Sequence, residues 1–455
     1  MNKIIASVGV VALGAANVQA QTSQYPSQSP LSAPAAKWWN VQATVRGFYD
    51  DNVSTTPDHQ SAAVVNKIPK VHTWGYELSP KVGISVGNDQ TTFTADYAYA
   101  FLYYDHRPVG NTKKYDQDHT FSMALNHAFN ERYSIRARDS FVVGQEPDTL
   151  RFASADAAIH NPYRLSGNNL ANSGGVTFEA AVTPLLGVEV GYDNNWYDYS
   201  DHFNPLPGGK NVDLAGDVSP SVSGLLDRIE QLPHIAALWH VAPETTASFG
   251  YQFEQINYTA DEQIEGNTAD VPPIKSSSRD NRSHTLYVGL DHQFRPDFYG
   301  SVQAGASYYD YYNLHSRSFG PFARLSLTYV YMEESFVQAG FQEGRAATDV
   351  IGAPGSPNLV RDTETSVAFA NLHQRIVPHF FANLNGTAQH ASFNGGGQAF
   401  NNKTENFLEF GANLEYQFNP HFSAHAGYDF DRLDSDLGDR SYSRNKVYIG
   451  ATASY

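Results

Sequence analysis

The sequence predicts an all-β fold, namely a transmembrane antiparallel up-and-down β-barrel of about 18 strands, with about 16 as the lower bound. Three observations support this prediction. Polar and apolar residues alternate along many runs, and the connections between the runs are alternately short and long. Aromatic residues make up 13% of the chain although its mean hydropathy is only −0.43. Weak overall hydropathy combined with period-two alternation is typical of such barrels.

The N-terminus predicts export. Lys3 supplies a positive charge, residues 4–16 are apolar, and Val18-Gln19-Ala20 resembles a leader-peptidase site. The apolar run is too short to span a bilayer, which needs about 20 residues, so residues 1–20 are interpreted as a signal peptide. Residues 21–36 are rich in Ser, Pro, Gln and Ala and predict a disordered periplasmic lead-in. Residues 37–455 form the predicted barrel. The chain has no cysteine, which excludes disulfides and a lipoprotein anchor.

The strands are predicted from alternation. In residues 407–418, for example, Leu408, Phe410 and Ala412 fall on one face, whereas Glu409, Gly411 and Asn413 fall on the other. Such runs indicate strands with one apolar and one polar face. A secreted β-sandwich would show the same pattern, but a sheet this large without a domain break must split or close. The predicted runs are 38–50, 73–86, 91–104, 118–129, 132–143, 174–183, 186–197, 233–241, 245–258, 284–294, 298–311, 319–331, 335–344, 365–376, 380–390, 405–418, 422–432 and 444–455.

The connections predict which end of the barrel faces which compartment. FNPHF, FRPDF and IVPHF mark short turns at residues 418–422, 294–298 and 376–380, where the fixed φ of proline suits a type I or II turn. The long connections are residues 52–72, 144–174, 198–232, 259–283 and 345–364. Tight periplasmic turns and long extracellular loops are the pattern of outer-membrane barrels. An even number of strands places both termini in the periplasm.

Aromatic residues and the C-terminus give two further indications. Trp and Tyr favour the membrane interface, so aromatics at strand ends predict girdles. The candidates for these girdles are Trp39, Trp74, Trp196, Trp239, Phe294, Phe298, Phe418 and Phe422. The last strand has an apolar face that ends on an aromatic residue, which resembles the signal read by the barrel-assembly machinery. Its residues are Val447, Ile449, Ala451, Ala453 and Tyr455.

Two stretches resemble a known family. Residues 45–53 read VRGFYDDNV and look like the YDDN opening of the putative β-barrel porin type 2 family. HAFNERYSI at residues 127–135, continuing to DSFVVGQEP at 139–147, is similar to the second hairpin of that family. The resemblance implies a Gram-negative outer-membrane barrel over nearly the whole mature chain, often associated with polysaccharide or envelope genes. It brings no catalytic residues and implies little about the substrate.

Charged residues on the polar faces are candidates for lining a pore. By parity they point into the barrel: Arg46, Glu77, Lys81, Arg136, Arg138, Glu179, Glu189, Glu254, Arg324, Glu409 and Glu415, together with Asp429 and Asp431. One interpretation is that basic and acidic walls create a field that orients polar solutes. The other is that the charges pair across strands without conferring selectivity. Both stay open for Arg136 and Arg138. The net charge of −17 predicts a mild cation preference.

The sequence gives little support for metal binding or catalysis. The 17 histidines include several near the predicted turns, and no pair has the i, i+4 spacing of metal ligands with an acidic partner. No Ser, His and Asn or Asp combination typical of barrel proteases or phospholipases is recognisable. Residues 431–439, DRLDSDLGD, lack the pattern of an EF-hand. We therefore expect no enzyme, no metal site, no cofactor and no nucleic-acid partner.

The sequence as a whole predicts an outer-membrane, porin-like channel for passive diffusion of small hydrophilic solutes, because a barrel of about 18 strands encloses an aqueous lumen. Two alternatives stay open, a conduit for a saccharide or exopolysaccharide and a non-conducting surface adhesin or structural barrel. The expected partners are the lipid bilayer, lipopolysaccharide, the assembly machinery and the solutes. The pattern is compatible with a homo-oligomer.

Overall fold

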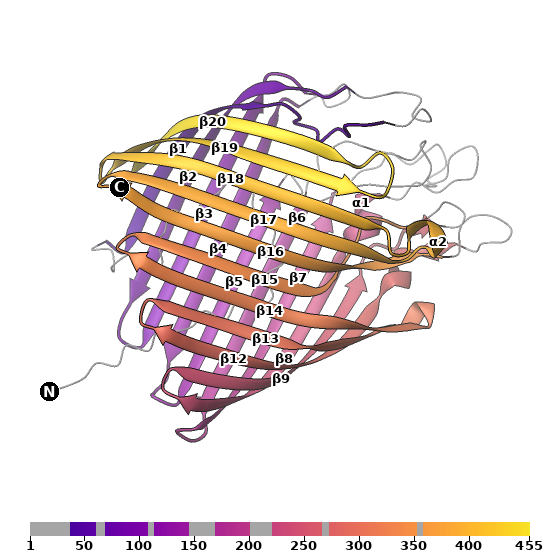
Figure 1. Cartoon of the computed structure of the whole chain (residues 1–455), viewed down its shortest axis with the longest axis horizontal. Coiled ribbons are helices and arrows are strands. Elements are labelled where there is room, and N and C mark those ends of the chain that lie inside the picture. The colour runs from indigo at the N-terminus through magenta and orange to yellow at the C-terminus, as the bar shows by residue number, and fades with distance from the viewer. Residues whose placement is uncertain are drawn as a thin grey trace.

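A single closed sheet dominates the computed structural model (Figure 1). The structure describes residues 37–60, 69–107, 113–144, 169–200, 221–265, 273–352 and 358–455. The predicted signal peptide and lead-in lie outside these residues.

The sheet has 18 strands. They are β1 (Trp39–Asp50), β2 (Thr73–Gly87), β3 (Thr91–Tyr104), β4 (Tyr115–Ala128), β5 (Tyr133–Gly144), β6 (Asn169–Ala181), β7 (Leu186–Tyr199), β8 (Arg228–Ala242), β9 (Thr245–Tyr258), β12 (Asn281–Arg295), β13 (Phe298–Tyr311), β14 (Ser316–Met332), β15 (Ser335–Ala346), β16 (Val360–Val377), β17 (Phe380–Gly395), β18 (Thr404–Asn419), β19 (Phe422–Ser435) and β20 (Tyr442–Ser454).

Each strand pairs antiparallel with its neighbours, and the first strand pairs with the last. β1 is in register with β2 on one side and with β20 on the other, where Thr44 lies opposite Thr452. β9 pairs with β12, so the ring has no gap where the smaller elements between them intervene. A closed barrel leaves no unpaired sheet edge, which is the condition for crossing a lipid bilayer with strands.

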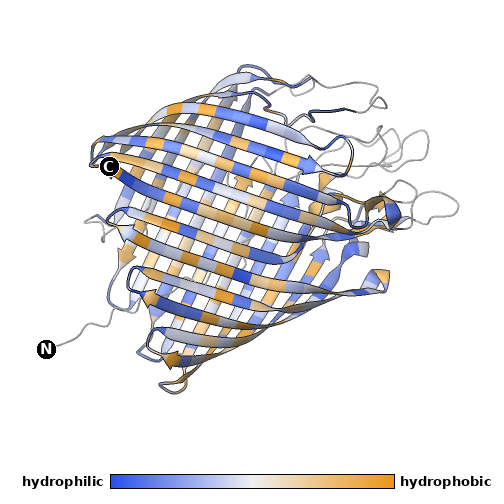
Figure 2. Cartoon of the chain, in the orientation of Figure 1, coloured by the Kyte–Doolittle hydropathy of each residue, from blue (hydrophilic) through white to orange (hydrophobic). Residues whose placement is uncertain are grey.

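The alternation places apolar side chains on the outside and polar ones on the inside (Figure 2). Val45 on β1 is 54% exposed on the outer face, whereas the next residue, Arg46, points into the lumen and pairs with Glu77. The same division holds on β18, where Leu408, Phe410 and Leu414 are exposed. An apolar outer band of this extent would be unfavourable in water and is the surface that a bilayer covers. The predicted transmembrane barrel is therefore confirmed.

All 18 predicted strands are present, but several are longer than predicted at the end with the long loops. β6 begins at Asn169 rather than at 174, and β8 begins at Arg228 rather than at 233. The additional residues include Gln231, which is exposed on the outer face, and Leu232, which is buried on the inner face, and this pair breaks the polar–apolar alternation on which the prediction rested. Backbone pairing continues there because strands above the apolar band need no apolar outer face.

The long connections contain short elements of their own. They are α1 (Val222–Leu226), a hairpin of β10 (Gln263–Glu265) and β11 (Ile274–Lys275), the 3₁₀ turns η1 (Ser276–Arg279) and η2 (Tyr312–Leu314), and α2 (Gly397–Phe400). The sequence predicted irregular loops at these places. No helix among the described residues is long and apolar enough to span a membrane.

The short turns carry paired aromatic side chains. The ring centroids of Phe418 and Phe422 are 5.4 Å apart, and those of Phe294 and Phe298 are 4.7 Å apart. In the IVPHF turn, His379 has a φ of 69°, as the third residue of a type II turn requires. The C-terminus lies at this end too, because Tyr455 donates its backbone N–H to Val41 near the start of β1 (Figure 1).

Gly305 tests the register of the barrel. A Cβ atom on Gly305 would lie 2.0 Å from the carbonyl oxygen of Leu286 on β12, whereas one on Gly344 would meet nothing within 4 Å. We expect Gly305→Val to force the strands apart, at a cost of roughly 1–3 kcal/mol or more, and to abolish heat-modifiable migration on a denaturing gel. Gly344→Val is the matched control and should keep it. Equal behaviour of the two variants would contradict this register.

Candidate functional site: the lumen and its mouth

The lumen carries two groups of charged side chains on opposite walls. One group belongs to β5–β9, β12 and β14, and the other to β18–β20, β1 and β2. β8 and β20 mark the two walls, and they are separated by seven strands in one direction (β1–β7) and by nine in the other (β9 and β12–β19). We call them the β8 wall and the β20 wall.

Ion pairs across neighbouring strands hold the β8 wall together. Arg136 on β5 reaches Glu189 on β7 at 2.9 Å and Glu179 on β6 at 3.7 Å. Arg138 pairs with Asp193 at 3.0 Å. The arginines can approach these carboxylates closely because glycines on the strand between them leave room. A Cβ on Gly175 would lie 2.2 Å from the carboxylate of Asp193. Arg136 and Arg138 are therefore paired within their own wall and do not form a basic face of their own.

His234 joins the two ion pairs. Its ring lies 3.6 Å from Asp193 and 3.9 Å from Glu189, both on β7. A Cβ on Gly191 would lie 2.2 Å from this ring, so the glycine lets the imidazole lie flat against the wall. His234 and Asp193 were not among the predicted lumen residues, although the parity of β7 and β8 places both inside.

Arg324 on β14 is the candidate that differs from the others. Its guanidinium packs over the ring of Phe322 at 4.8 Å, and its Nε atom is buried without a hydrogen-bond partner among the described residues. Arg324 lies opposite Gln303 of β13 on the lumen side of the sheet.

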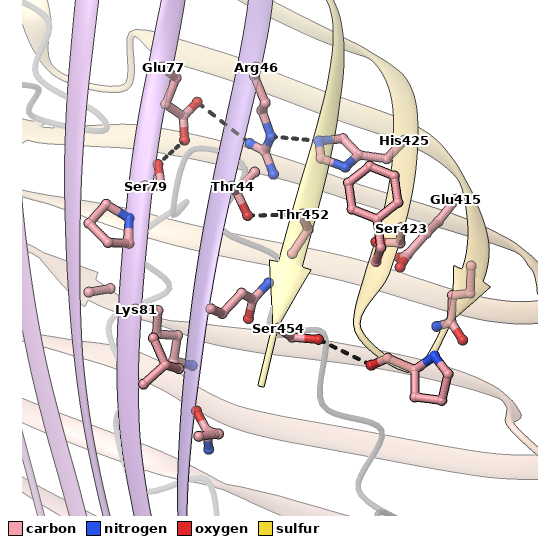
Figure 3. A pocket seen from close by; sticks show the side chains of 18 of the residues that line it. Thr44, Arg46, Glu77, Ser79, Lys81, Glu415, Ser423, His425, Thr452 and Ser454 are labelled. Atoms are coloured by element: carbon pink, nitrogen blue, oxygen red, sulfur yellow. Dashed lines mark hydrogen bonds and ion pairs between the residues drawn. The ribbon is translucent and has the colours of Figure 1, made fainter.

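A polar cavity of about 370 Å³ lies on the β20 wall, toward the end with the short turns (Figure 3). Arg46 donates from Nε to Nε2 of His425 at 3.0 Å, so this nitrogen is unprotonated in the bond. Arg46 also lies 3.6 Å from Glu77, and Glu415 faces His425 across the strand pair. Neutral groups complete the lining, among them Asn40, Gln42, Thr44, Ser79, Asn413, Gln417, Ser423 and Thr452.

The other predicted lumen residues are also on these walls. Lys81 pairs with Asp96 of β3 at 3.4 Å. Glu254 accepts a hydrogen bond from Ser283 at 3.0 Å. Glu409 lies opposite Asp431, and Arg444 of β20 approaches Asp431 to 3.6 Å. Each wall thus mixes both signs of charge among the described residues, which favours the interpretation of charges paired across strands over that of a basic wall facing an acidic wall.

Loops from distant hairpins pack together over the mouth at the other end. A buried apolar cluster joins the loops that follow β7, β9 and β15, through Val222, Leu225, Leu226, Ile264, Ile351 and Leu359. A second cluster joins the β15–β16, β17–β18 and β19–β20 loops, through Val350, Val360, Phe393, Phe400 and Leu437. We call the two clusters together the loop layer. The sequence analysis predicted long loops without predicting that they share a core.

Arg279 connects the parts of the loop layer. Its side chain is fully buried and donates to the backbone carbonyl of Thr348 at 2.7 Å and to that of Leu225, and it packs 4.5 Å from the ring of Tyr258. The loops that carry Leu225 and Thr348 are separated by six strands (β8, β9 and β12–β15), a third of the ring. Contacts between them therefore cross the mouth of the barrel. A buried arginine in a loop was not predicted, because no sequence pattern distinguishes it from a solvated one.

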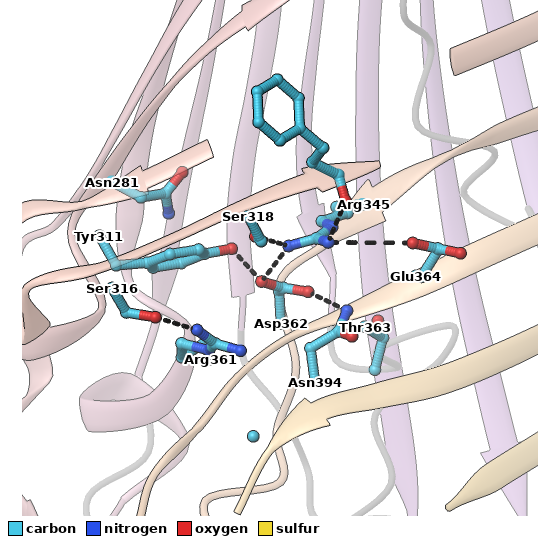
Figure 4. A network of polar contacts seen from close by, with 12 residues as sticks. Asn281, Tyr311, Ser316, Ser318, Arg345, Arg361, Asp362, Thr363, Glu364 and Asn394 are labelled. Carbon is cyan, nitrogen blue, oxygen red and sulfur yellow. Dashed lines mark hydrogen bonds and ion pairs between the residues drawn. The ribbon is translucent and has the colours of Figure 1, made fainter. Parts of the chain in front are cut away.

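Polar contacts support the same layer. Ser221, which caps α1, donates its backbone N–H to Glu262 of the next loop at 2.7 Å. Arg440 bonds to Glu405 and lies 3.2 Å from Asp349. Figure 4 shows a further network, in which Asp362 accepts hydrogen bonds from Tyr311 and from Asn394. Arg345 lies 3.4 Å from the same carboxylate and 2.7 Å from Ser318 (Figure 4).

Within the described part of the chain, no three His, Asp or Glu side chains are grouped so that they could hold a metal ion.

Comparison with known proteins gives a family over part of the chain. Residues 348–455 match the model of a family described as Putative beta-barrel porin 2. The resemblance to this family, suggested by residues in the first third of the chain, is confirmed by this match. No curated protein sequence matches the chain.

Solved barrels align over most of the chain at low similarity. OccAB4 of Acinetobacter baumannii is 12% identical, with 92% of this chain and 99% of that chain covered and a TM-score of 0.40. OpdK of Pseudomonas aeruginosa, solved with vanillate, is 10% identical (92% and 99% covered, TM-score 0.39). A mutant of the ferric enterobactin receptor PfeA of P. aeruginosa is 9% identical (91% and 81% covered, TM-score 0.42).

Ion selectivity tests the position of Arg324. Arg324→Gln removes a lumen charge that has no ion-pair partner among the described residues, so the preference for cations should increase about twofold, as expected for one partly screened charge. The measurement is the reversal potential across a bilayer under a salt gradient. Arg317→Gln, on the outer face of the same strand and 71% exposed, is the control and should leave the potential unchanged. A shift for Arg317 but not for Arg324 would contradict the assignment of faces.

The loop layer should be less stable at higher pH because of Asp227. Burial, with added repulsion from Asp198 and Glu262, raises the pKa of this carboxyl to about 6 from its ordinary 3.8. Between these two values the folded layer holds a proton that the unfolded loop releases, so stability falls as the pH rises through this window. Hydrogen exchange of residues 222–226, corrected for intrinsic rates, should therefore show stronger protection at pH 4 than at pH 7.

Asp227→Asn should remove most of this pH dependence. The control is Asp261→Asn, at a carboxylate that is 83% exposed, and it should leave the dependence intact. Protection that increases with pH would show that the sign of this effect is wrong.

Proposed function

We propose that the protein is a channel of the bacterial outer membrane for passive diffusion of small hydrophilic solutes. The observation that carries the proposal is the contrast between the two surfaces of the barrel. Side chains on the outer surface are apolar, whereas those on the inner surface are charged or hydrogen-bonding and border a polar cavity of about 370 Å³. A polar lumen inside an apolar wall holds water, and water-filled lumens pass polar solutes.

The proposed orientation follows from the two ends of the barrel. The short turns and the C-terminal strand would face the periplasm, and the loop layer would face the outside. Residues 447–455 would serve as the signal for the assembly machinery after removal of residues 1–20. Lipid and lipopolysaccharide would surround the apolar band. The pore itself would act without catalysis or cofactor.

The mixed charges of the two walls favour a pore that selects solutes by size over one that selects ions strongly by charge. Arg136, Arg138 and Lys81 are each paired with an acidic residue. Paired charges keep a lumen wet without attracting one sign of ion strongly. The loop layer would then set the upper size of the solute, because its contacts cross the mouth.

A saccharide conduit is the second candidate, and one observation favours it. The cavity of the β20 wall is lined by several neutral amides and hydroxyls, such as Asn40, Gln42 and Asn413. These groups both donate and accept hydrogen bonds and suit sugar hydroxyls. The loop layer gives weaker support to a non-conducting adhesin, since a closed mouth presents a continuous surface.

Single-channel recording of the refolded full chain in a planar bilayer distinguishes these functions. Stepwise conductance that neutral sugars leave unchanged supports diffusion of small solutes. Conductance that one sugar blocks in a concentration-dependent way supports the saccharide conduit. Absence of conductance would contradict both and favour the adhesin.

Loosening the loop layer should increase the current. Arg279→Ala removes two hydrogen bonds to backbone carbonyls, each worth about 1 kcal/mol or more for a charged donor, so the open state should be populated several-fold more. Arg282→Ala is the control, because Arg282 lies three residues away on the outer face and pairs with Asp310. An unchanged current in Arg279→Ala would show that the layer does not limit passage.

A further inference from the structure

The polar cavity of the β20 wall has one charged side chain without a counter-ion. Its charged lining residues are Arg46, Glu77, Lys81 and Glu415. Arg46 lies 3.6 Å from Glu77, and Lys81 lies 3.4 Å from Asp96 of β3. Among the described residues, Glu415 of β18 has neither an ion pair nor a side-chain hydrogen bond, although it is half-buried (Figure 3). The cavity therefore carries one uncompensated negative charge.

The strands on either side of β18 do not neutralise Glu415. His425 lies opposite it on β19. Nε2 of His425 accepts a hydrogen bond from Arg46 at 3.0 Å, so the imidazole carries a single proton and no charge. On the other side, β17 places Phe381 opposite Glu415. Neither neighbouring strand thus sets a cation opposite this carboxylate.

A second polar group beside Glu415 is without a partner. Asn413 is two residues away on the same face of β18 and also lines the cavity. Only 8% of Asn413 is exposed, yet its side-chain oxygen has no hydrogen-bond partner among the described residues. A buried acceptor without a donor costs free energy, and a bound donor removes this cost. Because no hydrogen bond fixes the amide, its rotation can present the oxygen to a solute in the cavity.

A row of neutral groups lies next to Glu415, toward the short turns. Its members are cross-strand partners on five successive strands, from β18 through β19, β20 and β1 to β2, and all of them line the cavity: Gln417, Ser423, Thr452, Thr44 and Ser79. We call them the neutral row. Amides and hydroxyls both donate and accept hydrogen bonds, so the row suits the hydroxyl groups of a solute.

We propose that this cavity binds an amino sugar, a solute in which a primary ammonium group lies next to several hydroxyl groups. The ammonium donates to the carboxylate of Glu415 and to the side-chain oxygen of Asn413, and the hydroxyls bond to the neutral row. A primary ammonium has three N–H donors, enough for one carboxylate and one amide oxygen. The inference rests on the proposed channel function, because solutes reach the cavity through a water-filled lumen.

A neutral sugar or an anion matches the cavity less well. A neutral sugar would leave the half-buried charge of Glu415 without a counter-ion, which is costly. An anionic solute would be repelled by the same carboxylate, and both cations of the cavity, Arg46 and Lys81, already have acidic partners. The uncompensated charge therefore selects a cation, and the neutral row selects a cation that carries hydroxyls.

Saturation-transfer NMR of the refolded full chain in a neutral detergent tests the site. Glucosamine is the probe, glucose lacks its ammonium group, and ethylamine lacks its hydroxyls. We expect glucosamine to bind about tenfold more tightly than glucose, the effect of one charge-assisted hydrogen bond. Glucosamine should also bind about tenfold more tightly than ethylamine, which makes no hydrogen bonds to the neutral row.

Two variants and a control separate this site from a general attraction of cations to an acidic barrel. Glu415→Gln keeps the size of the side chain and removes its charge, so glucosamine should bind about tenfold more weakly, at the level of glucose. Asn413→Ala should weaken glucosamine about threefold through the loss of one neutral acceptor. Glu333→Gln removes the same charge from a short turn, where Glu333 is 85% exposed, and should leave binding unchanged. Heat-modifiable migration confirms that each variant is folded.

Several results would overturn the proposal. Equal binding of glucosamine and glucose would remove the role of the charge, and equal binding of ethylamine would remove that of the neutral row. Full binding of glucosamine by Glu415→Gln, or an equal loss in Glu333→Gln, would show that the amine is not held in this cavity. A barrel that conducts ions without preferring glucosamine would refute this inference alone, whereas absence of conductance would refute the channel itself.

Discussion

Every backbone N–H and C=O group inside a lipid bilayer needs a partner within the protein, because the hydrocarbon offers none. β1 fulfils this condition by pairing with β2 and with β20, residue by residue from Gln42 to Asp50 on the β20 side. The remaining structure follows from that closure. Once the sheet is a ring, one side of every strand faces lipid and the other faces the lumen, and each side chain must suit one of the two.

The sequence was sufficient to predict the features that follow from closure of the sheet, namely which residues face the lipid and which face the lumen. Alternation such as Leu408, Phe410 and Ala412 against Glu409, Gly411 and Asn413 depends only on which face a residue takes, and a period of two can be recognised in a single chain. The short turns were predictable for a related reason, since proline in FNPHF and IVPHF has few conformations available. The lumen-facing side of Arg46, Glu77 and Arg324 followed from the same parity.

Contacts between distant loops were not predictable from the sequence. Arg279, Leu225 and Thr348 lie far apart in the chain and meet only because the barrel brings their loops over one opening. Nor does parity say which charges pair. Arg138 reaches Asp193 across β6 because Gly175 leaves room, and that detail depends on three strands at once.

The central claim is that the loop layer lies over a conducting lumen and controls access to it. Because the chain has no cysteine, Leu225→Cys together with Ile351→Cys gives a clean test of this claim. Both residues belong to the cluster that joins the β7–β8 and β15–β16 loops. The decisive measurement is single-channel current of this double variant under oxidising and then reducing conditions. The account predicts that a disulfide forms in the folded barrel, lowers the current, and is reversed by reductant. A disulfide-linked barrel whose current equals that of the reduced barrel would contradict it.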